Sequence, residues 1–239
     1  MQNSLYKRDV TSFFYGNSAY VIFGVYVLLS MILAFFWGMY FFDDNSSMMS
    51  FFAYQPQVMV MIVPAITMRC WAEERRSGTI ENLLTFPLSA WNLMFSKFAA
   101  AFTIVMIMLL FSIPLLLTTI GYVKVDFENV LSAYAGLIGM AMVLTAGGCL
   151  VSSIAGIPMA AYLLGLLFGA LWVNLNFGNI ITSVWKNAPL YFDGVLNFDA
   201  NYQNFLNGQI SPASLFYFLS LSALLLLFNW LVVSDWRAK

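Results

Sequence analysis

The sequence predicts an all-α integral membrane protein with six transmembrane helices, and two observations lead to that prediction. Of the 239 residues, 62% are hydrophobic and only 9% are charged, whereas soluble domains carry about 25% charged residues. Long apolar runs recur along the chain, and about 20 apolar residues are what an α-helix needs to cross the hydrocarbon core of a bilayer. A soluble globular fold is therefore excluded.

Six runs meet this length criterion, and the whole chain, residues 1–239, is expected to form one transmembrane domain. The predicted spans are Ala19–Phe42, Tyr54–Trp71, Leu93–Tyr122, Val130–Ala155, Pro158–Thr182 and Pro212–Ser234.

The basic residues predict the orientation of these spans. If both termini lie in the cytoplasm, the outer side carries only Lys124 and Lys186. The cytoplasmic side then carries Lys7, Arg8, Arg69, Arg75, Arg76, Lys97, Arg237 and Lys239. Because cytoplasmic loops are enriched in Lys and Arg, we expect cytoplasmic termini in a protein of the cytoplasmic (inner) membrane.

The composition also argues against several functions. The chain has no histidine, which removes the commonest general base and metal ligand, and no metal site or catalytic residue is predicted. A net charge of −1 offers nucleic acid no basic surface. The predicted spans have no charge near their centres, which disfavours ion-coupled carriers and channels with charged filters. Cys70 and Cys149 lie in separate apolar runs and are expected to be small buried hydrophobes, with no disulfide framework.

The most charged break joins the second and third spans and reads MRCWAEERRSGTIENLLTFPLS at residues 68–89. Gly78 can break a helix, and Thr79 can cap a new one. Beyond them, apolar residues recur at helical spacing: Ile80, Leu83, Leu84 and Leu88. Pro87 would end this helix, and Ser89 is placed to cap the helix of the third span. The region 72–89 is therefore predicted to contain, after Gly78, a short amphipathic helix of about two turns that lies along the cytoplasmic membrane face.

This segment has two interpretations from spacing alone. It could be a loop anchored at the lipid headgroups, in which Arg75 and Arg76 only supply the positive charge of a cytoplasmic loop. It could instead be a docking helix that presents a polar edge to a cytoplasmic partner.

A family resemblance favours the second interpretation. Residues Met68–Lys97 contain an M-R pair, an E-E-R-x-x-G-T core, an L-L-x-x-P motif and a lysine ahead of the third span. This pattern resembles the permease subunits of ABC transporters in the ABC-2 family, most closely the gliding-motility and copper-processing branch. The resemblance extends over nearly the whole chain, up to a closing Trp236-Arg237 pair.

The resemblance implies a coupling helix that contacts a separate ATP-binding subunit. The residues at or beside that contact would be Glu73, Glu74, Arg75, Arg76, Gly78, Thr79 and Glu81. It also implies two ATPase subunits that bind ATP and Mg, a second permease subunit of the same or a related kind, and an N-terminal elbow helix at residues 1–18. An ordinary flank of the first span is the alternative for that N-terminal segment.

The chain itself lacks the motif of an ATP site. A Walker A loop needs G-x-x-x-x-G-K-[ST], and none of the lysines follows a glycine or precedes serine or threonine. We therefore expect a non-catalytic subunit of an ATP-hydrolysing complex, with no cofactor in this chain.

Two further segments have distinctive residue types. Ala161, Gly165 and Gly169 recur every four residues in the fifth span, a stripe that lets helices approach closely within one subunit or between two. The aromatic-rich outer loop at residues 183–211 suggests interfacial helices, with a sugar-stacking surface as the alternative.

The leading prediction is thus the permease subunit of an ABC exporter. The alternative is a membrane anchor or scaffold that recruits a cytoplasmic partner through the charged loop.

Overall fold

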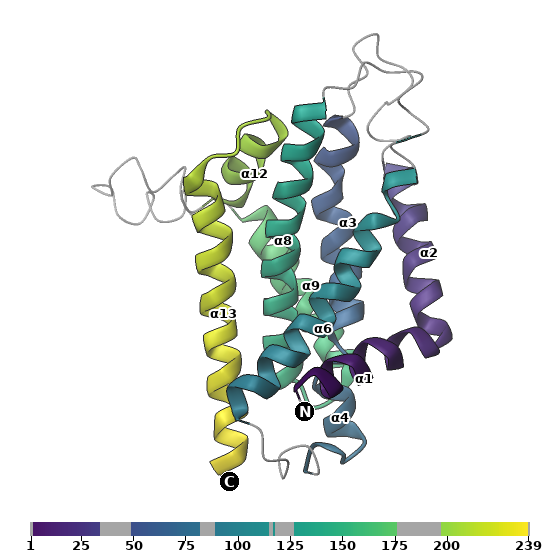
Figure 1. Ribbon diagram of the computed structural model, residues 1–239, viewed down its shortest axis with the longest axis vertical. Coiled ribbons are helices and arrows are strands. Elements are labelled where there is room, and N and C mark those ends of the chain that lie inside the picture. The colour runs from purple at the N-terminus through teal and green to yellow at the C-terminus, as the bar shows by residue number, and fades with distance from the viewer. Residues whose placement is uncertain are drawn as a thin grey trace, which may run out of the picture.

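The computed structural model is a bundle of helices (Figure 1) and describes residues 2–33, 49–81, 89–114, 117, 127–175 and 197–238. The regular elements in these ranges are all helical, which confirms the all-α class. In chain order they are α1 (Gln2–Tyr15), α2 (Asn17–Ile32), α3 (Met49–Thr67), α4 (Ala72–Arg76), α6 (Ala90–Leu110), α8 (Phe127–Ile154), α9 (Pro158–Asn174), α12 (Phe198–Leu206) and α13 (Pro212–Ala238).

An apolar helix lies in each of the predicted runs, but not every helix is long enough to be a span on its own. In the described part of the chain, four helices are long and apolar enough to cross a membrane, or five if the bent pair α1 and α2 counts as one span. The remaining apolar helix, α9, has 17 residues, or about 26 Å of helix. Residues 34–42 and 176–182, which the sequence assigns to the first and fifth spans, lie outside the described residues. Six spans therefore stay a prediction.

The third predicted span begins where expected and is interrupted after Leu110. The Ser89 side chain accepts a hydrogen bond from the Asn92 amide at 3.2 Å, which confirms Ser89 as the N-cap of α6. The helix was predicted to continue to Tyr122; α6 stops at Leu110, Ile113 and Pro114 are helical again, and residues 115–116 and 118–126 lie outside the described residues. Pro114 explains this end, because it has no N–H to donate to the Leu110 carbonyl and its ring crowds that carbonyl.

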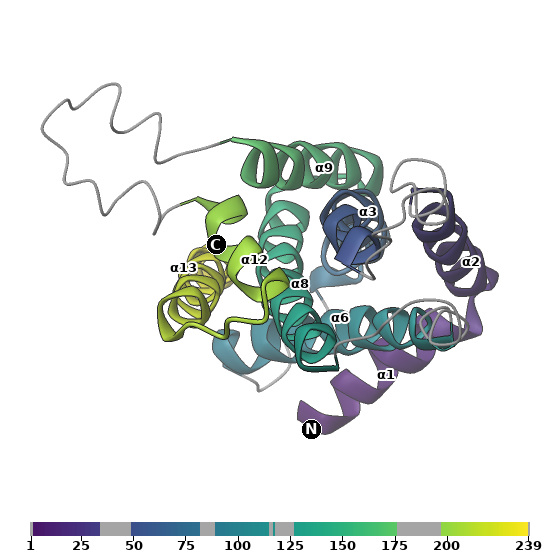
Figure 2. The same ribbon diagram turned by 90° about the horizontal axis from the view of Figure 1, so that it is seen from above.

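Helix α8 forms the centre of the bundle, with α3, α6, α9, α12 and α13 packed around it (Figure 2). Adjacent glycines allow two of these contacts. A Cβ at Gly148 would overlap the Thr67 side chain of α3, and one at Gly147 would overlap Phe168 of α9. Small residues therefore bring the neighbouring helices unusually close at this level of α8.

The outer faces of α9 and α13 are apolar and exposed. They carry Leu163, Leu164, Leu167 and Leu171 on α9, and Phe216, Leu219, Phe228 and Leu231 on α13. Soluble monomers rarely expose contiguous apolar patches of this extent, so these faces are suited to lipid.

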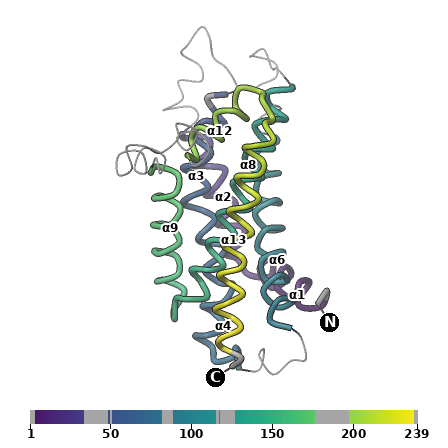
Figure 3. The backbone as a smooth tube through the Cα atoms, turned by 90° about the vertical axis from the view of Figure 1, so that its left-hand side faces the viewer, coloured from purple at the N-terminus to yellow at the C-terminus, as the bar shows by residue number. Residues whose placement is uncertain are grey.

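Helix α1 lies across the lower part of the bundle rather than along it (Figures 1 and 3). It is bent by 74° from α2 and packs against α6, where the Tyr6 and Thr103 hydroxyls are 3.0 Å apart. Residues 1–18 were predicted to form an elbow, and a helix with such a bend is present there. Its position at a membrane interface remains a prediction.

Helix α12 lies within the predicted outer loop, residues 183–211. Its aromatic residues Phe198, Tyr202 and Phe205 are buried, and the Tyr202 hydroxyl donates to the Phe52 carbonyl of α3 at 2.8 Å. These three rings pack inside the bundle, so they supply neither an interfacial belt nor a sugar-stacking surface. Residues 183–196 lie outside the described residues.

Candidate functional site

The turn between α3 and α4 is held firmly by α8. The Ser152 hydroxyl accepts hydrogen bonds from the amides of Trp71 and Ala72, each at 3.1 Å. It also donates to the Met68 carbonyl at 3.1 Å. One side chain thus satisfies three backbone groups of a turn that has few internal hydrogen bonds of its own. The buried Trp71 ring adds an edge contact with Trp236 of α13, with centroids 5.6 Å apart.

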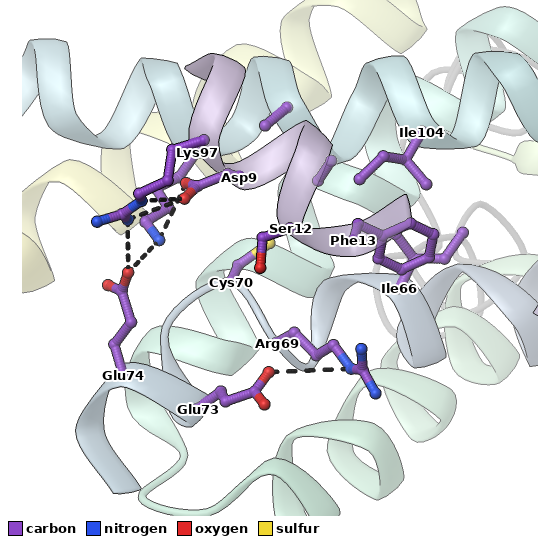
Figure 4. Close-up of a pocket in the computed structure, with 13 residues that line it drawn as sticks. Asp9, Ser12, Phe13, Ile66, Arg69, Cys70, Glu73, Glu74, Lys97 and Ile104 are labelled. Carbon is purple, nitrogen blue, oxygen red and sulfur yellow. Dashed lines mark hydrogen bonds and ion pairs between the residues drawn. The ribbon is translucent and has the colours of Figure 1, made fainter. Parts of the chain in front are cut away.

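A charged cluster joins the start of this segment to α1 and α6 (Figure 4). Lys97 of α6 is only 5% exposed, and its Nζ lies 2.6 Å from Glu74 Oε1 and 3.1 Å from Asp9 Oδ2. Arg8 bridges the same two carboxylates, at 2.8 Å from Asp9 Oδ1 and 3.0 Å from Glu74 Oε1. The cations and the carboxylates balance, which is the condition for burying a lysine in an apolar bundle.

Two carboxylate oxygens of these ion pairs have no hydrogen-bond donor among the described residues. Glu74 Oε2 and Asp9 Oδ2 accept no hydrogen bond from the described residues, although both atoms are buried. Asp9 Oδ2 lies 3.1 Å from Lys97 Nζ, so it is stabilised by the charge of the ammonium group. Arg8, Asp9, Glu74 and Lys97 line one side of a cavity of about 410 Å³. Its apolar wall comes from α1, α3 and α6 and includes Phe13, Ile66 and Ile104.

Arg75 ties α4 to the end of α8. Its Nη1 donates to the carbonyls of Ser153 and Ile154 at 3.1 and 3.4 Å. These carbonyls belong to the last turn of α8, where a cation is favoured by the helix dipole. The guanidinium also lies 5.3 Å from the centroid of the Trp236 ring.

The contact residues that the resemblance implies therefore fall into two groups. Glu74 points inward to Lys97, and Arg75 reaches the end of α8. Arg75 is itself exposed, and so are the residues of the second group: Glu73, Arg76, Gly78, Thr79 and Glu81. Glu73 has a single long ion pair with Arg69, at 3.9 Å, which contributes little at an exposed position.

The local helix differs from the predicted one. The sequence placed a helix after Gly78, whereas the described residues also form α4 before it, over Ala72–Arg76. Gly78 adopts φ +71°, a left-handed conformation suited to glycine, which confirms it as the break. Ile80 and Glu81 are helical again, and residues 82–88 lie outside the described residues.

Sequence reasoning missed the roles of Arg8, Asp9 and Lys97. One signal was available: Lys97 stands inside a long apolar run, and a buried lysine needs a carboxylate partner. Which carboxylate it meets depends on the fold, because Asp9 and Glu74 come from two other helices.

The stripe of small residues on α9 packs within the chain. Ala161 is buried with Ala72 and Ala155. A Cβ at Gly165 would meet the Pro64 ring of α3, and one at Gly169 would meet Val60 of α3 and Leu144 of α8.

Within the described helices and turns, no group of three His, Cys, Asp or Glu residues is close enough to hold a metal ion.

Comparison with known families matches residues 12–176 to the model of the ABC-2 family transporter proteins. The match runs from the end of α1 through α9 and includes the turn, α4 and Lys97. A comparison with curated proteins gives no match. Since the family model covers more than half of the chain, the protein belongs to the ABC-2 family of transporter proteins.

Proposed function

We propose that this chain is the permease subunit of an ABC exporter, and that residues 69–81 receive the movement of a separate ATPase. The observation that carries this proposal is the combination of an exposed charged surface with a rigid attachment beneath it. Glu73, Arg76 and Glu81 are exposed, whereas Trp71 and Glu74 fix the same segment to the bundle.

The attachments suggest how movement would spread. A push on α4 would act on α1 and α6 through the Glu74 ion pairs, on α8 through Ser152 and Arg75, and on α13 through Trp236. Since these contacts tie α4 to α1, α6, α8 and α13, the helices would move together as rigid bodies, a common form of conformational transition in proteins. A loosely held loop would absorb the displacement instead.

The rest of the proposed assembly follows from the family resemblance. Two permease subunits, identical or related, would bind two ATPase subunits that hold ATP and Mg. Six spans would place both termini in the cytoplasm of the inner membrane, with α1 as an interfacial elbow. The motif at residues 68–97 favours the gliding-motility and copper-processing branch, so the energy could also drive an envelope process.

Co-purification tests the proposal. The chain would be co-expressed with candidate ABC ATPases from its genome, and ATPase binding and turnover would be measured in detergent or nanodiscs. We expect the triple variant Glu73→Lys/Arg76→Glu/Glu81→Lys to raise the Kd for the ATPase at least about tenfold, equivalent to 1.4 kcal/mol.

The matched control is Glu128→Lys, which gives the same change in net charge at the exposed start of α8. This residue lies at the opposite end of the bundle and should leave binding unchanged. Equal binding by both variants would move the contact away from residues 69–81. If the native chain bound no ATPase but captured another cytoplasmic protein through this segment, the scaffold alternative would replace the transporter proposal.

A further inference from the structure

The two cysteines of the chain meet in space. Cys70 follows α3 and Cys149 lies in α8, 79 positions further along the sequence, yet their sulfur atoms are 3.7 Å apart. Both are free thiols. Their burial as small hydrophobes was expected, whereas their contact could not be read from two separate apolar runs.

The surrounding contacts fix the positions of Cys70 and Cys149 relative to each other. Gly148, next to Cys149, allows α8 to approach Thr67 at the end of α3 more closely than any side chain would permit. One turn later, Ser152 holds the backbone on both sides of Cys70, through the Met68 carbonyl and the Trp71 amide. The position of Cys70 relative to α8 is therefore fixed by the same interactions that fix the turn.

The two thiols differ in their access to small reagents. Cys70 is partly exposed and lines the cavity bounded by Lys97, Glu74 and Arg69. Figure 4 shows its sulfur among the side chains that line this space. Cys149 is fully buried behind it. An accessible thiol next to a buried one is the arrangement of an attacking and a resolving cysteine.

We propose that Cys70 and Cys149 form a thiol pair that is oxidised to a disulfide by exchange with a low-molecular-weight disulfide that enters the cavity. The Cys70 thiolate attacks one sulfur of the reagent, which releases one small thiolate and leaves a mixed disulfide on Cys70. The Cys149 sulfur then attacks Cys70 Sγ, and the second small thiol leaves with the Cys149 proton. Both protein thiols are oxidised, the reagent is reduced to two thiols, and the sulfurs close from 3.7 Å to the bond length of about 2 Å.

The disulfide would join the turn covalently to α8. The consequence for coupling rests on the proposed function: if ATPase closure displaces the turn relative to α8, the bond opposes that movement and lowers ATPase stimulation. Reduction of the disulfide by excess thiol would restore ATPase stimulation.

The chemistry is tested on the purified full chain in nanodiscs, treated with oxidised glutathione and then denatured and alkylated. Since the chain has only two cysteines, the count of free thiols should fall from two to zero, with intact mass showing the loss of two hydrogens and no adduct. Cys149→Ser should trap the glutathione adduct on Cys70, and Cys70→Ser should leave Cys149 unmodified. Two free thiols in the treated native chain, a persistent adduct, or disulfide-linked dimers would overturn the thiol pair.

The functional arm uses the reconstituted ATPase complex. Oxidation should lower ATPase stimulation in the native complex, reversibly, and leave the Cys70→Ser/Cys149→Ser complex unchanged. A disulfide that forms without any loss of stimulation would overturn the role in coupling. Failure of the reduced chain to bind any ATPase would contradict the proposed function alone, because the thiol count is measured without the ATPase.

Discussion

At the residue scale, Lys97 determines how the end of the bundle that carries α4 is organised. Its ammonium group lies inside the bundle, so it needs carboxylates that arrive from elsewhere in the fold. Asp9 of α1 and Glu74 of α4 supply them, and Arg8 neutralises their remaining charge. The result is one electrostatic unit made by three helices.

Neutralising Lys97 should therefore destabilise the protein strongly. In Lys97→Met, Glu74 and Asp9 keep their charges but lose their buried partner, and breaking a buried ion pair in this way costs about 3–5 kcal/mol. We expect a clear fall in the thermal unfolding temperature in detergent. Arg76→Met, which removes an exposed charge, serves as the control and should change little.

A double-mutant cycle tests whether Glu74 is the partner of Lys97. Glu74→Gln in the Lys97→Met background should restore part of the lost stability, because the unpaired carboxylate is removed. Contacting residues of this kind show coupling energies of about 0.5–3 kcal/mol. Strictly additive effects of the two substitutions would contradict the pairing of Lys97 with Glu74.

A second prediction at the residue scale concerns Ser152. Ser152→Ala leaves the Trp71 and Ala72 amides and the Met68 carbonyl without their partner, at a cost of about 1–3 kcal/mol for buried unsatisfied groups. Hydrogen exchange at the Trp71 and Ala72 amides should accelerate. Ser234→Ala is the control, since among the described residues the Ser234 hydroxyl bonds only to the Leu231 carbonyl of its own helix. Equal effects of both variants would refute this role for Ser152.

The sequence predicted the residues whose role is local and missed those whose partner is distant. Ser89 as a cap and Gly78 as a break follow from neighbours within a few positions, and both are confirmed. Glu74 belongs to the predicted contact surface, yet its carboxylate turns toward Lys97, 23 positions away. The sulfur contact between Cys70 and Cys149 spans 79 positions. Such pairings depend on how helices cross, which periodicity does not encode.

At the element scale, the glycines of α8 set the distances between helices. Gly147 and Gly148 face different neighbours, so two helices approach α8 at the same level. The interface is stabilised by close van der Waals packing, which is the main source of helix association where lipid is as apolar as the side chains.

Gly148→Ala should separate α3 from α8. The added methyl group would overlap the Thr67 side chain, and overpacking of this kind costs about 1–3 kcal/mol. Gly24→Ala is the matched control in α2, where a Cβ meets nothing within 4 Å and the gain in helix propensity is up to about 1 kcal/mol. Thermal unfolding should thus show opposite signs for the two variants, and a neutral Gly148→Ala would show that the helices are not in close contact there.

The positions of the helices were easier to predict than the residues at which they end. Every predicted run contains an apolar helix, because hydrophobicity over about 20 residues is a strong signal. The end of α6 at Leu110 was missed, since the apolar composition continues to Tyr122 while Pro114 interrupts the backbone hydrogen bonds. Helix α4 was also missed, because five residues are too few to show a hydrophobic period.

At the scale of the whole molecule, the charged segment and both ends of the described chain lie toward the same end of the bundle. Figures 1 and 3 show α4 and the two termini toward the lower end and α12 at the upper end. The distribution of Lys and Arg independently predicts that this lower end is cytoplasmic. The fold and the charge pattern therefore agree on one orientation, in which an ATPase could reach residues 69–81.

Cysteine labelling in intact cells tests that orientation. In a Cys70→Ser/Cys149→Ala background, Ser77→Cys lies at the exposed turn after α4 and Gln209→Cys at the exposed connection between α12 and α13. A membrane-impermeant maleimide should label Gln209→Cys in intact cells, and Ser77→Cys only after the membrane is permeabilised, because the bilayer separates the two ends. Labelling of both sites in intact cells would mean that the segment is not enclosed by the membrane, and the reverse pattern would invert the topology. Either result would place residues 69–81 out of reach of a cytoplasmic ATPase, so this measurement constrains the proposed function without requiring that its substrate be known.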